Sequence, residues 1–240
     1  MIYYEEVSGL NTTIRSMLLS PASFESTAAV EQAVMPFATP MEFSGKQLIS
    51  NLQEDFSSVY YIKSGGTYHV MTGENTEKLL YQLQPGWFFG NIFPGDPRDE
   101  AISVYALDRS EIWRIPRKEY LQLLASDPGL ASYILKLLGV MHDYLTAEIG
   151  NLSFNSCKTR LMRIYCSQVE GASLSEDGKW FCLDGKLTHN ELAAAVGSAR
   201  VTISKLINEL CDDGFLRIIN RRSQVSVDGY NDFMAQSANT

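Results

Sequence analysis

The sequence predicts an α+β fold with three parts: an antiparallel β-roll, a long helix and a winged helix-turn-helix. Three observations predict it: short strand-like runs between turns over residues 36–116, an apolar stripe with helical spacing over 130–152, and two short helices joined by a glycine turn after residue 187. We expect domains at 1–126, 127–153 and 154–240. With 240 residues, 45% of them hydrophobic, the chain can bury more than one core.

The predicted roll comprises short apolar or alternating runs such as VYYIKSG, TYHVMTG and AISVYALD. Gly65-Gly66, Pro85-Gly86 and Pro94-Gly95 supply turns between such runs. This regular spacing is typical of an antiparallel roll or a jelly-roll-like barrel. From the residues alone, such a barrel either holds a ligand or is filled by its own side chains.

A long helix is expected to begin at Ser126-Asp127-Pro128, because proline is favoured in the first helical turn. A two-stranded helical interface needs an apolar stripe, but a helix packed along its own barrel shows a similar one. Periodicity leaves both arrangements open. The apolar positions, at spacings of about four and three, are Leu130, Ile134, Leu138, Met141, Leu145 and Leu152.

Residues 187–222 predict two short helices and a β-hairpin. Thr188 and Glu191 have the spacing of a capping box, and Gly197 suits a helix C-cap. The second helix is expected from about Ser198, and FLRIINRRSQVSV follows as a strand, a basic tip and a strand. A winged helix-turn-helix, which places its second helix in the DNA major groove, has this pattern. An αα-hairpin packed on a small sheet has a similar one.

Side chains on the second helix and the hairpin tip are the candidate DNA contacts. They are Ser198, Arg200, Val201, Thr202, Ser204, Lys205, Arg221 and Arg222. The net charge of −8 belongs to the part before Phe154, which has 10 Lys+Arg and 18 Asp+Glu, whereas the remainder has 10 of each. A protein with so few basic contacts is expected to bind random DNA modestly and to depend on dimerisation.

The C-terminal segment resembles the DNA-binding end of the cAMP receptor protein/fumarate-nitrate regulator (Crp/Fnr) family. The resemblance rests on Val196-Gly197, on Arg200-Val201-Thr202-Ile203-Ser204-Lys205, on Leu206 to Leu210 and on Gly214-Phe215-Leu216. In the N-terminal half, VYYIKSGGTYHV followed by LQPGWFFGN is similar to the family's cyclic-nucleotide-binding domain. The resemblance covers nearly the whole chain. It implies a homodimeric transcription activator whose long helix pairs across a two-fold axis and closes an effector pocket.

The positions that hold cAMP in that family differ in this chain. Members that bind cAMP use Gly-Glu after the F-F-G turn and Arg-Ser in the following strand, where the arginine pairs with the phosphate. This chain has Gly90-Asn91 at the first pair and Glu100-Ala101-Ile102 at the second. Since a glutamate repels a phosphate, we expect an effector other than cAMP.

Two segments, Glu77–Tyr81 and Gly90–Pro94, are similar to the halorespiration regulators of the family, which sense chlorinated hydroxyaryl acids. Tyr81 stands at their ligand tyrosine, whereas Asn91 and Val140 stand where they have lysines. The resemblance implies an aryl or chlorinated hydroxyaryl acid, or a less acidic compound, as the effector. The expected pocket residues are Tyr81, Gly90, Asn91, Ile92, Ile102, Leu137, Met141 and Tyr144.

Two other functions compete with effector control. One is a constitutive or thiol-redox-controlled regulator with a side-chain-filled barrel, in which Cys157 or Cys166 is the switch. The other is a cupin-like barrel enzyme, which needs several histidines, whereas the predicted barrel has only His69. We therefore expect no enzyme activity, no catalytic residue, no metal site and no cofactor. The family's N-terminal iron–sulfur cluster is excluded, because no cysteine precedes Cys157.

The expected partners follow from the resemblance. They are a second copy of the chain, a small-molecule effector, RNA polymerase and double-stranded DNA with an inverted repeat. Half-sites rich in A·T pairs are expected, because Val201 cannot accept a hydrogen bond but can pack on a thymine methyl group. The first residues lack the features of a signal peptide and no apolar run reaches the length of a membrane span, so we expect a cytoplasmic location.

Overall fold

The structure is a computed structural model, and it describes residues 17–19, 27–51, 57–73, 76–90, 92 and 102–237. The described residues form two compact units, 17–150 and 151–237. The division falls near the end of the long helix α3 (Pro128–Phe154). The domain boundaries expected from the sequence, after residues 126 and 153, stay a prediction.

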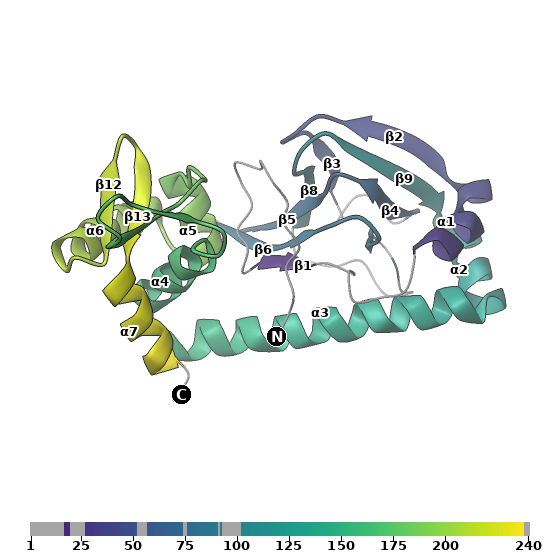
Figure 1. The fold of residues 1–240 in the computed structure, drawn as a ribbon. Helices are drawn as coiled ribbons and strands as arrows, with labels where there is room; N and C mark the ends of the chain where they lie inside the picture. Colours follow the sequence, from purple (N-terminus) through teal and green to yellow (C-terminus); the bar gives the residue numbers. More distant parts are fainter. Residues whose placement is uncertain are drawn as a thin grey trace. The chain divides into compact units, whose positions relative to one another are not determined.

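The first unit is a β-roll, as the strand-like runs predicted (Figure 1). Its described strands form two sheets, with the orders β1-β6-β5-β8-β3 and β2-β9-β4-β7. The pairs are antiparallel apart from β1–β6, which is parallel. The strands are β1 (Leu18–Leu19), β2 (Thr39–Phe43), β3 (Leu48–Asn51), β4 (Ser58–Ser64), β5 (Thr67–Thr72), β6 (Glu77–Leu83), β7 (Phe88–Gly90), β8 (Ile102–Ala106) and β9 (Ser110–Pro116).

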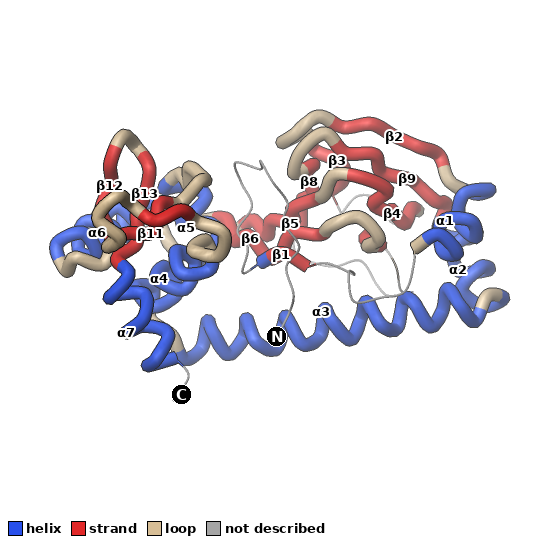
Figure 2. Tube along the Cα trace, in the orientation of Figure 1, coloured by secondary structure: helices blue, strands red, loops and turns tan. Residues whose placement is uncertain are grey.

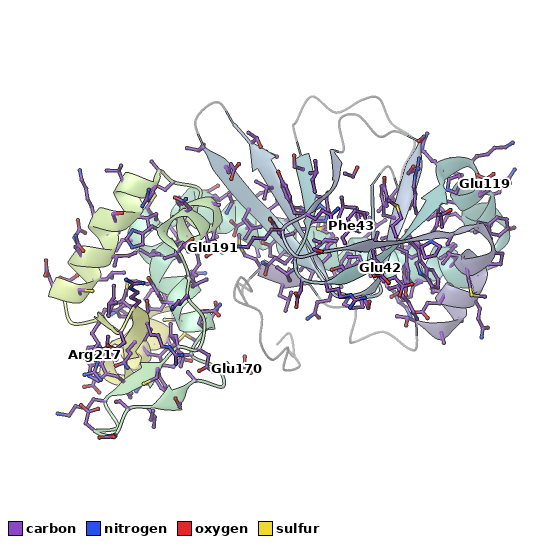
Figure 3. The ribbon with its side chains drawn as sticks, turned by 90° about the horizontal axis from the view of Figure 1, so that it is seen from above. Glu42, Phe43, Glu119, Glu170, Glu191 and Arg217 are labelled. Carbon is purple, nitrogen blue, oxygen red and sulfur yellow. The ribbon has the colours of Figure 1, made fainter. Side chains whose placement is uncertain are left out.

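Side-chain alternation along the strands builds the core of the roll. On β2, Phe43 is buried, whereas the neighbouring Glu42 is exposed (Figure 3). Helices add Val34 and Tyr120, which are fully buried in the same core. Besides α3, the helices of this unit are α1 (Ala28–Val34), the 3-10 helix η2 (Met35–Phe37) and α2 (Arg117–Ser126).

Helix α3 begins at Pro128, as predicted. Asp127 caps it: the carboxylate accepts hydrogen bonds from the backbone N–H of Gly129 at 2.8 Å and of Leu130 at 3.1 Å. Asp127 is extended, as a residue before proline prefers, so α2 stops there and α3 leaves at a bend of 107°. No single helix in the described part of the chain is long and apolar enough to cross a membrane. The α2–α3 pair meets that length and composition only across its bend.

The apolar stripe of α3 divides into two halves. Leu130 and Ile134 are buried in the core of the roll, at 2 and 3% exposure. Leu145 and Leu152 are 40 and 42% exposed. Packing on the chain's own roll therefore accounts for the first half of the stripe only.

The second unit is a winged helix-turn-helix with a four-stranded sheet in the order β10-β11-β13-β12 (Figure 2). The prediction of two helices before a hairpin is confirmed. The elements are α4 (Cys157–Ser167), β10 (Ser173–Leu174), β11 (Trp180–Cys182), α5 (His189–Val196), α6 (Arg200–Asp212), β12 (Leu216–Ile219), β13 (Arg222–Ser226) and α7 (Val227–Ser237).

Local signals at α5 act as the sequence predicted. Thr188 caps the helix by accepting from the backbone N–H of Glu191, whose carboxylate accepts from the N–H of Thr188 at 2.8 Å. Gly197 ends the helix with φ of 70°, a conformation that costs glycine little.

Candidate DNA-binding surface and effector cavity

The expected recognition helix is α6, and it begins at Arg200 rather than near Ser198. The N–H of Ser198 bonds to the carbonyl of Ala193 at 3.0 Å and so closes α5. Ala199 is extended, with ψ of 144°, and precedes the first helical residue. Ser198 therefore lies in the turn between the two helices, which the continuous pattern of the sequence did not resolve.

One face of α6 is buried and its first turn is open. Ile203, Ile207 and Leu210 form the buried face. Arg200, Val201 and Lys205 are exposed, Val201 by 67%, and Thr202 is half-buried beside them. The helix therefore offers two cations and one apolar side chain to a partner, the combination that reads phosphates or guanine together with a thymine methyl group.

Ser204 is occupied within the protein. Its hydroxyl donates to the carbonyl of Arg200 at 3.1 Å and lies 2.8 Å from Nδ1 of His189. Because its hydrogen is already donated, the hydroxyl accepts from His189, so the imidazole carries its proton on Nδ1. His189 thus ties α5 to α6, a role that sequence reasoning missed because the two residues are 15 positions apart.

The wing is a tight hairpin beside α6 (Figure 1). Asn220 and Arg221 form its tip with φ of 51 and 62°, the left-handed pair that a two-residue turn requires. Arg222 begins β13 opposite Ile219, and both arginines are exposed. The basic tip expected from the sequence is therefore open to an anionic partner.

Arg217 is held against the sheet instead. Its guanidinium lies 4.3 Å from the ring centroid of Trp180, and its Nε donates to Oε1 of Gln224 at 2.6 Å. Figure 3 labels this side chain on the second unit. Arg217 thus stabilises the sheet that carries the wing.

A cavity of about 220 Å³ lies in the first unit, between the roll and α3. Strands β5, β6 and β7 supply one wall and α3 supplies the other. The described lining residues are His69, Tyr81, Leu83, Trp87, Phe88, Phe89, Gly90, Ile92, Ile134, Leu137, Leu138, Met141 and Leu145.

Most of the predicted effector residues that the structure describes meet at this cavity. Tyr81, Gly90, Ile92, Leu137 and Met141 line it. Two others stand outside the lining: Ile102, which is buried on β8, and Tyr144, whose hydroxyl donates to the carbonyl of Leu80 at 2.6 Å. The predicted Asn91 lies outside the described residues.

The structure adds two polar groups to the lining, His69 and Trp87. His69 is 1% exposed, and burial lowers the pKa of its imidazole to about 3, so the ring is neutral. Its Nε2 lies 3.2 Å from the hydroxyl of Thr67. Among the described residues, neither Nδ1 of His69 nor Nε1 of Trp87 has a hydrogen-bond partner. Burying such an atom unpaired costs about 1–3 kcal/mol.

Sequence reasoning treated His69 as structural and Trp87 as core. Both are buried in the core, but they also line the cavity. Their side of the strand or turn was readable from the pattern, whereas the empty space beside them depends on how α3 packs.

The cysteines differ in exposure. Cys166 is buried, and burial raises the pKa of its thiol to about 12, which keeps it a poor nucleophile at neutral pH. Cys157 is half-buried and accepts a hydrogen bond from Nη2 of Arg160 at 3.3 Å. The described residues contain no group of three or more His, Cys, Asp or Glu side chains that could hold a metal ion.

Two family models match the chain. They are the cyclic nucleotide-binding domain over residues 40–127 and the Crp-like helix-turn-helix domain over residues 159–228. Among curated relatives, the cyclic AMP receptor protein of Thermus thermophilus is 25% identical over 191 residues, which span 79% of this chain and 84% of that protein.

Solved structures show the same fold. A CooA mutant from Carboxydothermus hydrogenoformans has a TM-score of 0.64 at 20% identity and covers 90% of this chain and 93% of its own. CprK in complex with OCPA has a TM-score of 0.63 at 14% identity, covering 86% of this chain and 93% of its own. At such identities the likeness bears on the fold alone, and it confirms the β-roll, long helix and winged helix-turn-helix expected from the sequence.

Proposed function

Because the chain belongs to the Crp/Fnr family of DNA-binding transcription regulators with an effector-binding domain, we propose that it is a homodimer that binds an inverted-repeat DNA site under the control of a small molecule other than cAMP. The observation that carries the proposal is the open, basic first turn of α6. The cavity in the first unit supports the effector part. An effector that prefers one arrangement of the dimer shifts its DNA affinity by that preference.

The proposed base contacts lie on one exposed surface of α6. Arg200 meets a phosphate or a guanine, Lys205 reaches a guanine or a phosphate, and Val201 packs on a thymine methyl group. Ser198 and Thr202 contact the backbone of the duplex at the start of the helix. Ser204 acts by orienting the helix, since its hydroxyl is bonded to Arg200 and His189.

The wing adds phosphate contacts. Arg221 and Arg222 are exposed at and beside the hairpin tip, where they fit the backbone next to the groove that α6 enters. Such contacts position the protein without reading sequence. A·T-rich half-sites follow from Val201, which reads thymine but leaves cytosine unread.

The second half of α3 is the proposed dimer interface. Leu145, Ile149 and Leu152 are spaced by four and three and are 40, 65 and 42% exposed. Residues at this spacing lie on one helical face, so a second copy of α3 can cover them. Dimerisation must hold the two copies of α6 about 34–36 Å apart for both to enter successive major grooves.

Two side-chain contacts connect strand β6 of the cavity wall to α3. Nζ of Lys78 pairs with Oε1 of Glu148 at 2.8 Å, and both side chains are less than a fifth exposed. The hydroxyl of Tyr144 donates to the carbonyl of Leu80. A ligand that moves β6 therefore pulls on the helix proposed to form the dimer, which supplies a route from the cavity to DNA affinity.

The competing functions are less well supported. A cavity of about 220 Å³ speaks against a barrel filled by its own side chains. The high pKa of Cys166 speaks against a thiol switch at that residue. We propose no catalytic activity, because the family consists of transcription regulators. Activation through RNA polymerase and a cytoplasmic location complete the proposal.

Fluorescence anisotropy with a labelled inverted-repeat, A·T-rich duplex at fixed salt tests the proposal. The matched control is a duplex of the same composition with one half-site scrambled. We expect tighter binding to the intact repeat, and a change in affinity on adding aryl or chlorinated hydroxyaryl acids but none on adding cAMP. Equal affinity for both duplexes would refute sequence-specific binding by a dimer. Identical affinity with and without every compound would favour the constitutive alternative.

A further inference from the structure

Two buried nitrogen atoms at the cavity lack hydrogen-bond partners among the described residues. They are Nδ1 of His69 and Nε1 of Trp87, on side chains that are 1 and 2% exposed. Buried polar groups in proteins are nearly always hydrogen-bonded, so two such atoms lining one cavity call for an explanation. A ligand that supplies the missing partners explains both.

The chemistry of the two nitrogens restricts that ligand. The indole N–H of Trp87 can only donate, so it needs an acceptor. Nδ1 of the neutral His69 accepts if Nε2 donates to the hydroxyl of Thr67, and donates if that hydroxyl donates to Nε2. A hydroxyl or an amide serves in either case, since each can donate and accept.

The rest of the described lining is mainly apolar. Side chains such as Leu83, Phe88, Phe89, Ile134 and Leu137 form it. A charged group placed among them loses its hydration without gaining an opposite charge, which is costly. The volume of about 220 Å³ exceeds the roughly 150 Å³ of an engineered cavity that holds benzene, so one substituted ring fits.

Resting on the effector control proposed above, we propose that the cavity binds an uncharged, one-ring compound whose polar group, a hydroxyl, carbonyl or amide, bonds to Trp87 and His69. The two residues act as the specificity determinants for that group, and the apolar wall holds the ring. The effector is then a neutral aromatic alcohol, phenol or amide rather than a carboxylate.

Isothermal titration calorimetry on the full-length protein without DNA tests this ligand class. The probes are benzamide, benzyl alcohol, benzoate and toluene, each with its 4-chloro counterpart. We expect the amide or the alcohol to bind at least about tenfold more tightly than the matched benzoate and the matched toluene. The proposal is overturned if benzoate binds as tightly as benzamide, or if none of the compounds binds.

Substitution of the tryptophan tests the hydrogen bond. Trp87→Phe keeps the aromatic ring and removes the N–H, so affinity for the best neutral probe is expected to fall about tenfold while toluene binding is unchanged. Trp113→Phe is the matched control, since Nε1 of Trp113 donates to Glu111 at 2.7 Å and lies outside the cavity lining. Equal losses in the two variants would contradict the assignment, as would no loss in Trp87→Phe.

His69→Leu supplies a second variant, with the same expected loss for the neutral probe. The comparison of probes on the unmodified protein needs no variant to fold. These titrations contain no DNA, so failure of the ligand class leaves sequence-specific DNA binding standing. Failure of DNA binding, in turn, leaves the titrations interpretable.

Discussion

At the scale of single residues, Lys205 is the clearest candidate for reading a base. It is exposed on α6, one turn after Arg200 and on the side opposite the buried Ile203 and Ile207. Its ammonium group is a point charge on a flexible stem, so it suits either a guanine or a phosphate. The two uses differ in how the loss is distributed between specific and random DNA.

Lys205→Ala is expected to lower the affinity for the inverted-repeat duplex by about 1–3 kcal/mol, which is roughly 5- to 150-fold, and to leave random DNA less affected. Anisotropy titrations against both duplexes measure this. Lys179→Ala is the control, because Lys179 is an exposed lysine at the β10–β11 turn. Equal weakening of specific and random DNA would mean that Lys205 contacts a phosphate only.

Gly90, a predicted effector residue, has a backbone that explains why glycine stands there. Its φ is 97°, and an added Cβ would lie 3.0 Å from the carbonyl oxygen of Ser58 and 3.2 Å from Cδ2 of Tyr60. Gly90→Ala is expected to destabilise the protein by about 1–3 kcal/mol in urea unfolding. Gly139→Ala on α3, where a Cβ meets nothing within 4 Å, is expected to stabilise it by about 0.5–1 kcal/mol. The same sign for both variants would contradict the strain argument.

His69 gives the protein a defined acid sensitivity. Burial lowers its pKa from 6.5 to about 3, so between these values the unfolded chain binds a proton that the folded chain does not. Stability contributed by this residue is therefore complete above pH 6.5 and is lost as the pH falls toward 3, by up to about 1.4 kcal/mol per pH unit. Urea unfolding at pH 7, 6 and 5 measures the slope.

The control for this slope is His142→Ala, since His142 is largely exposed on α3. That variant is expected to keep the slope, whereas His69→Leu is expected to reduce it. An unchanged slope in His69→Leu would mean that other groups produce the acid sensitivity.

At the scale of elements, the predictions that succeeded rest on local signals. The capping box at Thr188, the left-handed Gly197 and the proline start of α3 each depend on a few neighbouring residues, so the sequence shows them directly. The hairpin tip at Asn220 and Arg221 belongs to the same class. Such signals specify where an element begins or ends without reference to the rest of the fold.

Features set by long-range packing were harder to predict. The start of α6 was placed two residues early, because Ser198 is drawn into the end of α5 by a hydrogen bond to Ala193. The bond between His189 and Ser204 joins two helices, and the cavity beside His69 depends on α3 lying against β5–β7. Periodicity gives the buried face of an element but not the space left when two faces meet.

The connection of β6 to α3 yields a prediction at this scale. Lys78→Met breaks the half-buried pair with Glu148 and is expected to destabilise the first unit by about 1–2 kcal/mol, between the values typical of exposed and buried pairs. It is also expected to reduce the change in DNA affinity on effector binding. Thermal unfolding and anisotropy measure the two effects.

The control pair is Arg109–Glu42, whose side chains are 83 and 74% exposed. Arg109→Met is expected to cost less than about 0.5 kcal/mol and to leave the effector response intact. If Lys78→Met and Arg109→Met behave alike, the pair on α3 does not couple the cavity to the helix.

At the scale of the whole molecule, net charge and surface together favour a dimer. The chain carries a net charge of −8, and its proposed DNA contacts include only four basic side chains per copy: Arg200, Lys205, Arg221 and Arg222. One copy therefore has few phosphates to neutralise and weak affinity for any DNA. Two copies joined rigidly bind the second half-site at a high effective concentration, which raises affinity without new contacts.

The apolar face of α3 provides the test of this argument. Ile149→Glu places a charge at the most exposed position of the Leu145–Ile149–Leu152 face, so a dimer that buries this face should dissociate. Sedimentation velocity is expected to show a monomer, and affinity for the inverted repeat to fall about 100-fold or more. Affinity for a single half-site should change little, because α6 is untouched. His142→Glu, an exposed change elsewhere on the same helix, is expected to leave the dimer intact. A dimer that survives Ile149→Glu with full affinity would place the interface on another surface.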